Sequence, residues 1–347
     1  MVKVYLQYPW KFPDSPYYKY LIDSPPKDIK YLNVEKQKGV ITNKKAFWFS
    51  NFLKRNIRKW TKKFNVAVPN AHLSPKGDYN LIHCAHCLSK NKNIPWVADI
   101  EGFWQLYVGK RNNKVKKQIK KILLNDNCKK IMPWTEATKQ DILKEFPEIE
   151  NKIEVVYPAI PTQEIQRVPS EKINLVFVGR YFEGKGGLDA LKAIDFLTKK
   201  YENVYANFIS QTPKEILKEY SGNKKIKFYE LMPQNELFEI LSKTDILIYP
   251  GYSDSFGFIF LEAMSFGIPI ITVEGLSKKE IINDKIGFIV PKENVVNNLI
   301  SMGELLIENK ELRDEMSENC LKKIEEGKFS IKERNEKLKR IYEEALK

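Results

Sequence analysis

Two carboxylates stand eight positions apart in the segment Ser253–Met264. The apolar residues before it, within Asp245–Pro250, predict a buried strand that proline ends. A strand, a short loop with serine and glycine, and then a helix start form the corner at which α/β proteins bind phosphate and ribose. Gly257 lets a ligand approach the backbone closely. The two acids are Asp254 and Glu262, and Glu262, about two turns into the predicted helix, can accept hydrogen bonds from a vicinal diol.

Two cations follow a second apolar segment earlier in the chain. Leu175–Val178 predicts a strand that ends at Gly179, and Leu188–Ile194 predicts the helix that follows. Arg180 and Lys185 lie in the glycine-containing loop between them. A guanidinium fork and a mobile ammonium suit two neighbouring phosphates, and cations stabilise the charge that a departing nucleoside diphosphate develops. A lysine in such a loop is usually only solvated, but the acidic corner further along the chain favours a shared site.

The two segments together resemble the retaining glycosyltransferases of the GT-B fold, in particular glycosyltransferase family 4, the glycosyl transferases group 1. That family has Val-Gly-Arg, a short spacer and Lys-Gly, which Val178–Arg180 and Lys185–Gly186 match. Its second motif joins Phe-Gly to Leu-Glu-Ala-Met, which Phe256–Gly257 and Leu261–Met264 match. These motifs cover most of residues 170–300, whereas the N-terminal half resembles the family only by its pattern of elements.

The resemblance implies that a hexosyl group is transferred from a nucleotide sugar to an acceptor hydroxyl, with retention at the anomeric carbon. Arg180 and Lys185 would hold the diphosphate and Glu262 the ribose. Asp254 would face the transferred sugar, and it replaces a glutamate of the family with a side chain one methylene shorter. The alternative for Asp254 is an ordinary helix cap. The acceptor proton would pass to the leaving phosphate, so neither a metal nor another cofactor is expected. Further donor contacts are expected from Gly179, Leu231, Met232, Ser255, Phe256, Gly257 and Phe258, although core packing is the alternative for Leu231 and Met232.

Three further candidates lie in the N-terminal half. Asp99 and Glu101 stand at the end of the predicted strand Trp96–Ile100, and strand alternation places them on one side. His86 follows the predicted strand Leu81–Cys84. In the family that the chain resembles, the loop after the strand corresponding to Trp96–Ile100 faces the donor sugar and commonly carries a histidine. This chain has acids in that loop. We expect Asp99, Glu101 or His86 to bind a sugar hydroxyl or the acceptor; the alternative is a loop side chain that is only solvated or caps a helix.

Strand and helix patterns alternate along both halves of the chain, which predicts an α/β fold with a doubly wound parallel sheet in each half. By the resemblance, these two Rossmann-like domains face each other across a cleft, as in the GT-B architecture. We expect residues 1–165 to form the acceptor-side domain and residues 166–330 the nucleotide-sugar domain, with a proline-rich linker at Tyr157–Thr162. The charged helix over residues 331–347 should pack back on the N-terminal domain. Further predicted strands are Lys3–Gln7, Asn65–Val68, Lys130–Pro133, Ile153–Tyr157, Ala206–Ile209, Ile226–Glu230, Ile246–Tyr249, Ile270–Thr272 and Gly287–Val290.

The 347 residues carry a net charge of +14, which suits an anionic substrate, a polyanion or an anionic membrane surface. No segment approaches the roughly 20 apolar residues of a membrane span. Met1–Leu6 predicts a strand rather than a signal peptide, so a cytoplasmic location is expected. A basic nucleic-acid-binding protein is the alternative from another class, but no nucleic-acid-binding motif is present and no nucleic-acid partner is expected. A glycosyltransferase-like fold that has lost its activity, with Asp254 as the lesion, is a further alternative.

The segment Lys44–Phe64 combines many basic residues, no acid, and aromatic and apolar residues at helical spacing. Such a helix can lie in the interface of an anionic membrane. The alternative is a helix whose apolar stripe packs on its own sheet. We expect peripheral contact with the inner face of a membrane, together with an acceptor that is a glycan or lipid-linked, as in cell-envelope glycan biosynthesis.

Cys84 and Cys87 are the only closely spaced cysteines among four. A zinc site requires a second pair of ligands at a suitable spacing, and the sequence shows none. A redox pair is one alternative. We favour a packing role, in which Cys84 ends a strand and Cys87 begins the following helix.

Overall fold

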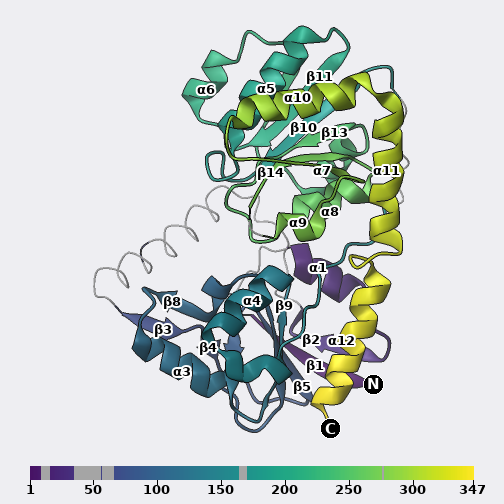
Figure 1. Cartoon of the computed structure of the whole chain (residues 1–347). Helices are drawn as coiled ribbons and strands as arrows, with labels where there is room; N and C mark the ends of the chain where they lie inside the picture. Colours follow the sequence, from purple (N-terminus) through teal and green to yellow (C-terminus); the bar gives the residue numbers. More distant parts are fainter. Residues whose placement is uncertain (9–15, 35–55, 57–65, 164–169, 276) are drawn as a thin grey trace. The chain divides into compact units, whose positions relative to one another are not determined.

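The computed structural model describes residues 1–8, 16–34, 56, 66–163, 170–275 and 277–347. These residues divide into two compact units (Figure 1). Unit 1 comprises Met1–Ala159 and Ile331–Lys347, and unit 2 comprises Ile160–Ser330. Each unit is built on a parallel β-sheet with helices around it, which is the expected α/β class.

The sheet of unit 2 has six strands in the order β12-β11-β10-β13-β14-β15, all of them parallel. The chain winds outward from β10 to one edge, then crosses back and continues from β13 to the other edge. The strand order therefore reverses between β10 and β13, and ligands of open α/β sheets bind beyond the carboxyl ends of the strands at such a point. The strands are β10 (Ile173–Gly179), β11 (Val204–Ser210), β12 (Ile226–Tyr229), β13 (Ile246–Ile248), β14 (Ile270–Val273) and β15 (Gly287–Val290).

Helices cover both faces of this sheet, with α5 and α10 on one face and α7 and α8 on the other (Figure 1). This explains why β10 is almost continuously apolar, since a strand covered on both faces has no side exposed to water. Leu175, Val176 and Phe177 are fully buried. The helices are α5 (Gly187–Lys200), α6 (Lys214–Glu219), α7 (Gln234–Leu241), α8 (Phe258–Ser265), α9 (Lys278–Ile281), α10 (Val295–Glu308) and α11 (Lys310–Glu325).

The sheet of unit 1 has five strands in the order β2-β1-β5-β7-β9, also parallel. Its strand order reverses between β1 and β5. Its main strands are β1 (Val2–Gln7), β2 (Ile29–Leu32), β5 (Leu81–Ala85), β7 (Trp96–Ile100) and β9 (Cys128–Pro133). Short pairs join β3 (Ala67–Pro69) to β8 (Tyr107–Gly109) and β4 (Ala71–His72) to β6 (Leu88–Ser89).

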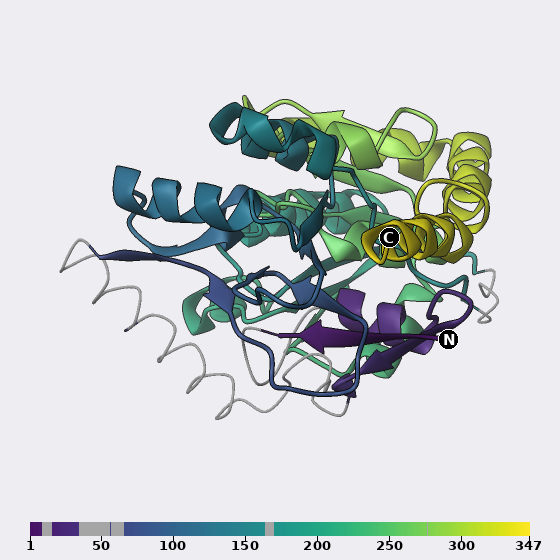
Figure 2. The same cartoon turned by 90° about the horizontal axis from the view of Figure 1, so that it is seen from below.

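The helices of unit 1 include the C-terminal helix α12 (Ile331–Ala345), drawn in yellow in Figures 1 and 2. This helix contacts β7 and β9. Its contacts are polar as well as apolar. The hydroxyls of Tyr342 and Tyr31 lie 3.0 Å apart, and Arg334 donates a 2.7 Å hydrogen bond to the carbonyl of Ser24. The other helices are α1 (Pro16–Asp23), α3 (Asn113–Leu123), α4 (Glu136–Glu145) and the 3₁₀ segments η2 (Phe103–Leu106) and η3 (Pro147–Lys152).

Two local predictions are wrong. The predicted strand Ile153–Tyr157 forms only one isolated bridge, between Ile153 and Ile131. The segment still donates backbone hydrogen bonds to β9, but it runs into the prolines of the linker, which have no amide to donate. Cys87 does not begin a helix, because His86 adopts a φ of 54° and turns the chain toward the short strand β6. Strand β2 was missed by the sequence reading.

The predicted basic helix Lys44–Phe64 lies, apart from Asn56, outside the described residues. None of the helices in the described ranges combines the length and the apolarity that crossing a bilayer requires.

Candidate functional site

The two loops at the switch point of unit 2 are joined by an ion pair. Lys185, in the loop from β10 to α5, contacts Oδ1 of Asp254, in the loop from β13 to α8. Tyr249 donates a 2.5 Å hydrogen bond to the other carboxylate oxygen. The side chains of Lys185 and Asp254 are 15% and 13% exposed, so the pair is screened from most of the solvent but still accessible. Both oxygens of Asp254 therefore already accept hydrogen bonds from the protein.

Backbone hydrogen bonds hold the same two loops together. The amide of Gly251 donates to the carbonyl of Lys185, and the amide of Ser253 donates to the carbonyl of Gly184, each at 3.0 Å. The pairing places the glycine-containing loop and the acidic corner at one edge of the sheet, as the sequence predicted for a shared site.

Two glycines make this approach sterically feasible. Gly186 has a φ of 74°, and a Cβ there would lie 2.5 Å from the side chain of Pro250. A Cβ at Gly179 would lie 2.9 Å from Cβ of Lys185. Any side chain at either position would push the loops apart and displace Lys185 from Asp254.

The remaining motif residues lie in the same two loops or at the start of α8. Arg180 directly follows β10 and is partly buried. Phe256 is buried, and Gly257, with a φ of 83°, precedes the first helical residue, Phe258. The carbonyl of Ser255 accepts a hydrogen bond from the hydroxyl of Ser277. The amides of this segment therefore lie at the N-terminus of α8, where an anion is favoured.

Glu262 lies on the buried side of α8 and is 6% exposed. Its Oε1 accepts a 2.9 Å hydrogen bond from Nε2 of Gln234, the first residue of α7. Leu231 and Met232, both partly buried, stand just before that helix. The residues expected near the base thus stand three and two positions before the hydrogen-bond partner of Glu262. Gln234 was missed, although a polar residue that opens the helix after Met232 is a usable signal.

Lys278 is a second functional candidate that the sequence reading missed. Its ammonium is buried, with 3% of the residue exposed, and donates hydrogen bonds to the carbonyls of Pro250 and Val273, the latter at 2.7 Å. Burial lowers its pKa to about 8; the nearby Asp254 opposes this shift, and the charges of Lys185 and Lys292 add to it. Nothing in the sequence distinguishes Lys278 from the adjacent Lys279, because only the fold determines which of them is buried.

In unit 1, Asp99 is an internal residue, 1% exposed. Oδ1 accepts hydrogen bonds from the hydroxyl of Tyr18 at 2.6 Å and the amide of His86 at 3.1 Å, and Oδ2 lies 2.9 Å from Nε2 of His83. Burial alone would raise the pKa of Asp99, but the hydrogen bond and charge of His83, with further help from His86 and Tyr18, lower it below its usual range. With both oxygens engaged inside the unit, Asp99 anchors the loop that carries His86.

His86 and Glu101 lie together after the ends of β5 and β7. Nδ1 of His86 is 4.0 Å from Oε2 of Glu101, and Gln105 contacts both side chains. Because the amide of Gln105 faces Nδ1, the hydrogen of the neutral imidazole belongs on Nε2. That atom is buried and has no hydrogen-bond partner among the residues that the structure describes. His86 and Glu101, which the sequence singled out separately, form one polar cluster.

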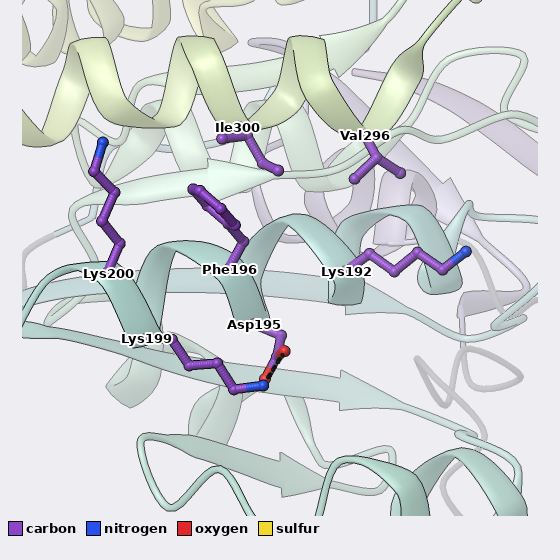
Figure 3. Close-up of a pocket in the computed structure, with 7 residues that line it drawn as sticks. All are labelled: Lys192, Asp195, Phe196, Lys199, Lys200, Val296 and Ile300. Carbon is purple, nitrogen blue, oxygen red and sulfur yellow. Dashed lines mark hydrogen bonds and ion pairs between the residues drawn. The ribbon is translucent and has the colours of Figure 1, made fainter.

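A hollow elsewhere in unit 2 lies between α5 and α10 (Figure 3). It contains none of the motif residues. Two of its lysines are already matched by acids, since Lys199 pairs with Asp195 at 2.7 Å and Lys200 with Glu304 at 2.5 Å. We therefore assign this hollow to the helix–helix seam and not to the site.

The family match lies within unit 2. Residues 161–323 match the family described as Glycosyl transferases group 1. A Klebsiella pneumoniae protein described as an uncharacterized 41.2 kDa protein in the cps region is 30% identical over 148 residues, which are 39% of this chain and 40% of that protein. The chain thus spans about two fifths of this relative. An uncharacterized glycosyltransferase of Methanocaldococcus jannaschii is 26% identical over 75% of this chain and 72% of its own length.

Solved structures share the fold over the whole chain. A glycosyltransferase from Rickettsia africae superposes with a TM-score of 0.69 at 16% identity and covers 100% of this chain and 98% of its own. Alr3699/HepE of Anabaena, solved in complex with UDP, superposes with a TM-score of 0.65 at 13% identity and covers 99% and 100%. The neighbours are GT-B glycosyltransferases, which confirms the fold class of two Rossmann-like α/β domains.

Proposed function

We propose that the protein is a glycosyltransferase that moves a hexosyl group from a nucleoside-diphosphate sugar to an acceptor hydroxyl, with retention at the anomeric carbon. The observation that carries the proposal is the pairing of Lys185 with Asp254, 69 positions apart, at the switch point of a Rossmann-like sheet. Open α/β sheets bind nucleotides at that point. The family match over residues 161–323 supports the same class of reaction.

The proposed reaction breaks the bond between the anomeric carbon and the diphosphate oxygen and forms a bond to the acceptor oxygen on the same face of the sugar. The acceptor proton passes to the leaving phosphate. Arg180 and Lys185 bind that phosphate and stabilise its developing charge. Lys185 is held in place by Asp254 before the donor arrives, which reduces the side-chain entropy that binding would otherwise cost.

The ribose would bind at Glu262. Gln234 orients the carboxylate of Glu262 by donating a hydrogen bond to its Oε1, and carboxylate oxygens are acceptors that suit the two hydroxyls of a vicinal diol. Leu231 and Met232 would contact the base from the segment before α7. The first nucleotides to test are UDP and GDP, and the complex of Alr3699/HepE with UDP favours UDP.

In unit 1, we propose that His86 and Glu101 contact the sugar or the acceptor. The hydrogen on Nε2 of His86 would donate to a sugar hydroxyl or oxygen that reaches this buried atom. Asp99 would act through its neighbours by fixing the amide of His86, because its own oxygens are engaged. Three further proposals rest on the sequence alone. The acceptor is a glycan or is lipid-linked, the protein is located in the cytoplasm, and residues 44–64 contact the inner face of a membrane.

A screen of nucleotide sugars tests the function. Thermal unfolding is measured with UDP- and GDP-linked hexoses, and release of UDP or GDP is then followed with and without glycan acceptors. We expect one donor to raise the unfolding temperature and to be turned over, with the anomeric configuration of the product read by NMR. If a donor binds but is neither transferred nor hydrolysed, the protein has a glycosyltransferase-like fold that has lost its activity. Salt-dependent retention on DNA without any response to nucleotide sugars would contradict the proposal.

A further inference from the structure

Lys278 is a buried cation beside the donor site that the proposed reaction does not use. It opens α9, and its ammonium donates hydrogen bonds to the carbonyls of Pro250 and Val273. Pro250 follows β13 and Val273 ends β14, and these two strands are neighbours in the sheet. The side chain therefore joins the carboxyl ends of two adjacent strands at the edge where the ligand is proposed to bind.

The Lys278 ammonium acts on the segment that carries Asp254. The carbonyl of Pro250, to which it donates, lies four positions before Asp254. The amide of Gly251, the next residue, donates to the carbonyl of Lys185. The loop held by Lys278 is thus the loop against which Lys185 is positioned.

The charges around Lys278 come from three loops. Asp254 lies after β13, Lys185 after β10, and Lys292 after β15. With Lys278 charged, two ammonium groups act on one carboxylate, and the cluster of Lys185, Lys278 and Asp254 has one net positive charge. With Lys278 neutral, Asp254 cancels the charge of Lys185.

We propose that Lys278 is a positioning residue of the donor site, which fixes the loop from Pro250 to Asp254 and offsets the charge of Asp254 so that Lys185 can bind the donor diphosphate. The identity of the ligand, a nucleoside-diphosphate sugar, rests on the proposed function. The contacts of Lys278 with the loop do not depend on it. A lysine is rarely buried without a specific reason, because desolvating its charge is costly. Here the lowered pKa is consistent with that cost and places the loss of the charge near pH 8.

The proposal makes nucleotide binding depend on pH through one residue. A neutral amine keeps two N–H donors, but it loses the charge assistance of both hydrogen bonds and its attraction for Asp254. The affinity for a nucleoside diphosphate should therefore fall as the pH rises through about 8, the pKa of Lys278. The expected loss is about tenfold, which corresponds to weakening of charge-assisted interactions and not to unfolding of the loop.

Binding of UDP and GDP is measured by calorimetry at pH 7.0 and pH 9.5 in the wild type, Lys278→Met, Lys278→Arg and Lys279→Met. Lys279 is the matched control, because it is the adjacent lysine and its side chain is exposed. We expect the wild type and Lys279→Met to weaken about tenfold at the higher pH. Lys278→Met should bind the nucleotide weakly at both pH values. Lys278→Arg stays charged and should bind the nucleotide with equal affinity at both pH values. If Lys278→Met does not fold, the comparison of the wild type with Lys278→Arg still decides the proposal.

A second readout needs no ligand. Amide hydrogen exchange over residues 250–257 is compared between each variant and Lys279→Met at the same pH. We expect faster exchange in Lys278→Met and, at pH 9.5, slower exchange in Lys278→Arg than in Lys279→Met. If exchange changes in this way but neither UDP nor GDP binds to any variant, the positioning role stands and the proposed donor is wrong. Equal affinity and equal exchange in all four proteins would overturn the proposal.

Discussion

Lys185 and Asp254 form an ion pair across the switch point of the sheet of unit 2, although they stand 69 positions apart in the chain. Two backbone hydrogen bonds support the pair, and Tyr249 occupies the second oxygen of Asp254. This arrangement changes the interpretation of Asp254. An acid that the family resemblance assigns to the sugar is also the residue that orients the cation proposed to bind the diphosphate.

Replacing Asp254 should therefore affect the diphosphate as well as the sugar. Asp254→Asn removes the charge that holds Lys185 and should lower the transfer rate at saturating donor by about tenfold or more, because Lys185 loses its fixed position. Tyr249→Phe removes only the hydrogen bond to Oδ2 and should have a milder effect in the same direction. Steady-state kinetics with the identified donor measure both, and Asp195→Asn on α5 is a control outside the site. If Asp254→Asn lowers the transfer rate by the same factor for every donor sugar, Asp254 acts by positioning Lys185. If the factor depends on the sugar, Asp254 contacts the sugar directly.

The pair of Glu262 and Gln234 should control affinity for the nucleoside. Glu262→Gln keeps the shape of the side chain but removes the charge, so nucleotide affinity should fall about tenfold through the loss of a charge-assisted hydrogen bond. Gln234→Leu should weaken binding as well, because it removes the partner that fixes the buried carboxylate. Calorimetric titration with UDP and GDP measures both, with the exposed Glu236→Gln on α7 as control. Unchanged affinity in both variants would exclude Glu262 from the ribose site.

A buried chain of polar groups connects α12 to the edge of the unit 1 sheet. The hydroxyl of Tyr342 lies 2.7 Å from Nδ1 of His83, whose Nε2 lies 2.9 Å from Asp99. Tyr342→Phe should lower the free energy of unfolding by about 1–3 kcal/mol, because it leaves a buried imidazole nitrogen without its partner. Urea unfolding followed by circular dichroism measures the loss. A variant as stable as the wild type would show that the chain of hydrogen bonds does not stabilise the unit.

The lowered pKa of Asp99 predicts how the stability of the protein depends on pH in acid. Because its folded-state pKa lies below the unfolded value near 3.8, the stabilising effect is complete above that value and is lost as the pH falls through the folded-state pKa. Stability should therefore decrease below about pH 4 with a slope that Asp99→Asn reduces. Unfolding free energies between pH 6 and pH 2.5 test this. Parallel curves for the two proteins would contradict the assignment.

For Lys278 the free energy of unfolding should also rise with pH, but the effect appears in alkali. Its pKa falls from 10.5 in the unfolded chain to about 8 in the folded protein, so between these values the unfolded state binds one more proton. The free energy of unfolding of the wild type should then rise with pH relative to Lys278→Met, by at most about 3 kcal/mol across this window. Chemical unfolding at pH 7.5 and pH 10 measures the difference. A constant difference would show that Lys278 titrates normally.

Much of the fold could be predicted, because its signals are local. The apolar runs of β10, β13 and β14 and the cap of α4, where Thr135 accepts a 3.1 Å hydrogen bond from the amide of Thr138, are written in neighbouring residues. Strand β2 was missed, and Ile153–Tyr157 was assigned wrongly. Whether each of these segments forms a strand depends on its pairing with another strand. A pattern of neighbouring residues contains no information on that pairing.

The candidate site divides in the same way. Arg180, Lys185, Asp254 and Glu262 could be named because they stand in recognisable motifs. Gln234 and Lys278 could not, because only tertiary packing brings them to Glu262 and Pro250. The burial of Asp99 was also beyond the sequence, since it depends on Tyr18 and His83 from other elements.

The role of Lys185 is tested most directly by the affinity of the protein for UDP and GDP before and after loss of the Lys185 charge. Titration calorimetry compares the wild type with Lys185→Met and with Lys199→Met, a control on the outer seam of α5. We expect one nucleotide to bind to the wild type and to the control, and the affinity of Lys185→Met to be at least about tenfold weaker. Equal affinity of the two variants, or no binding of either nucleotide by the wild type, would contradict this role.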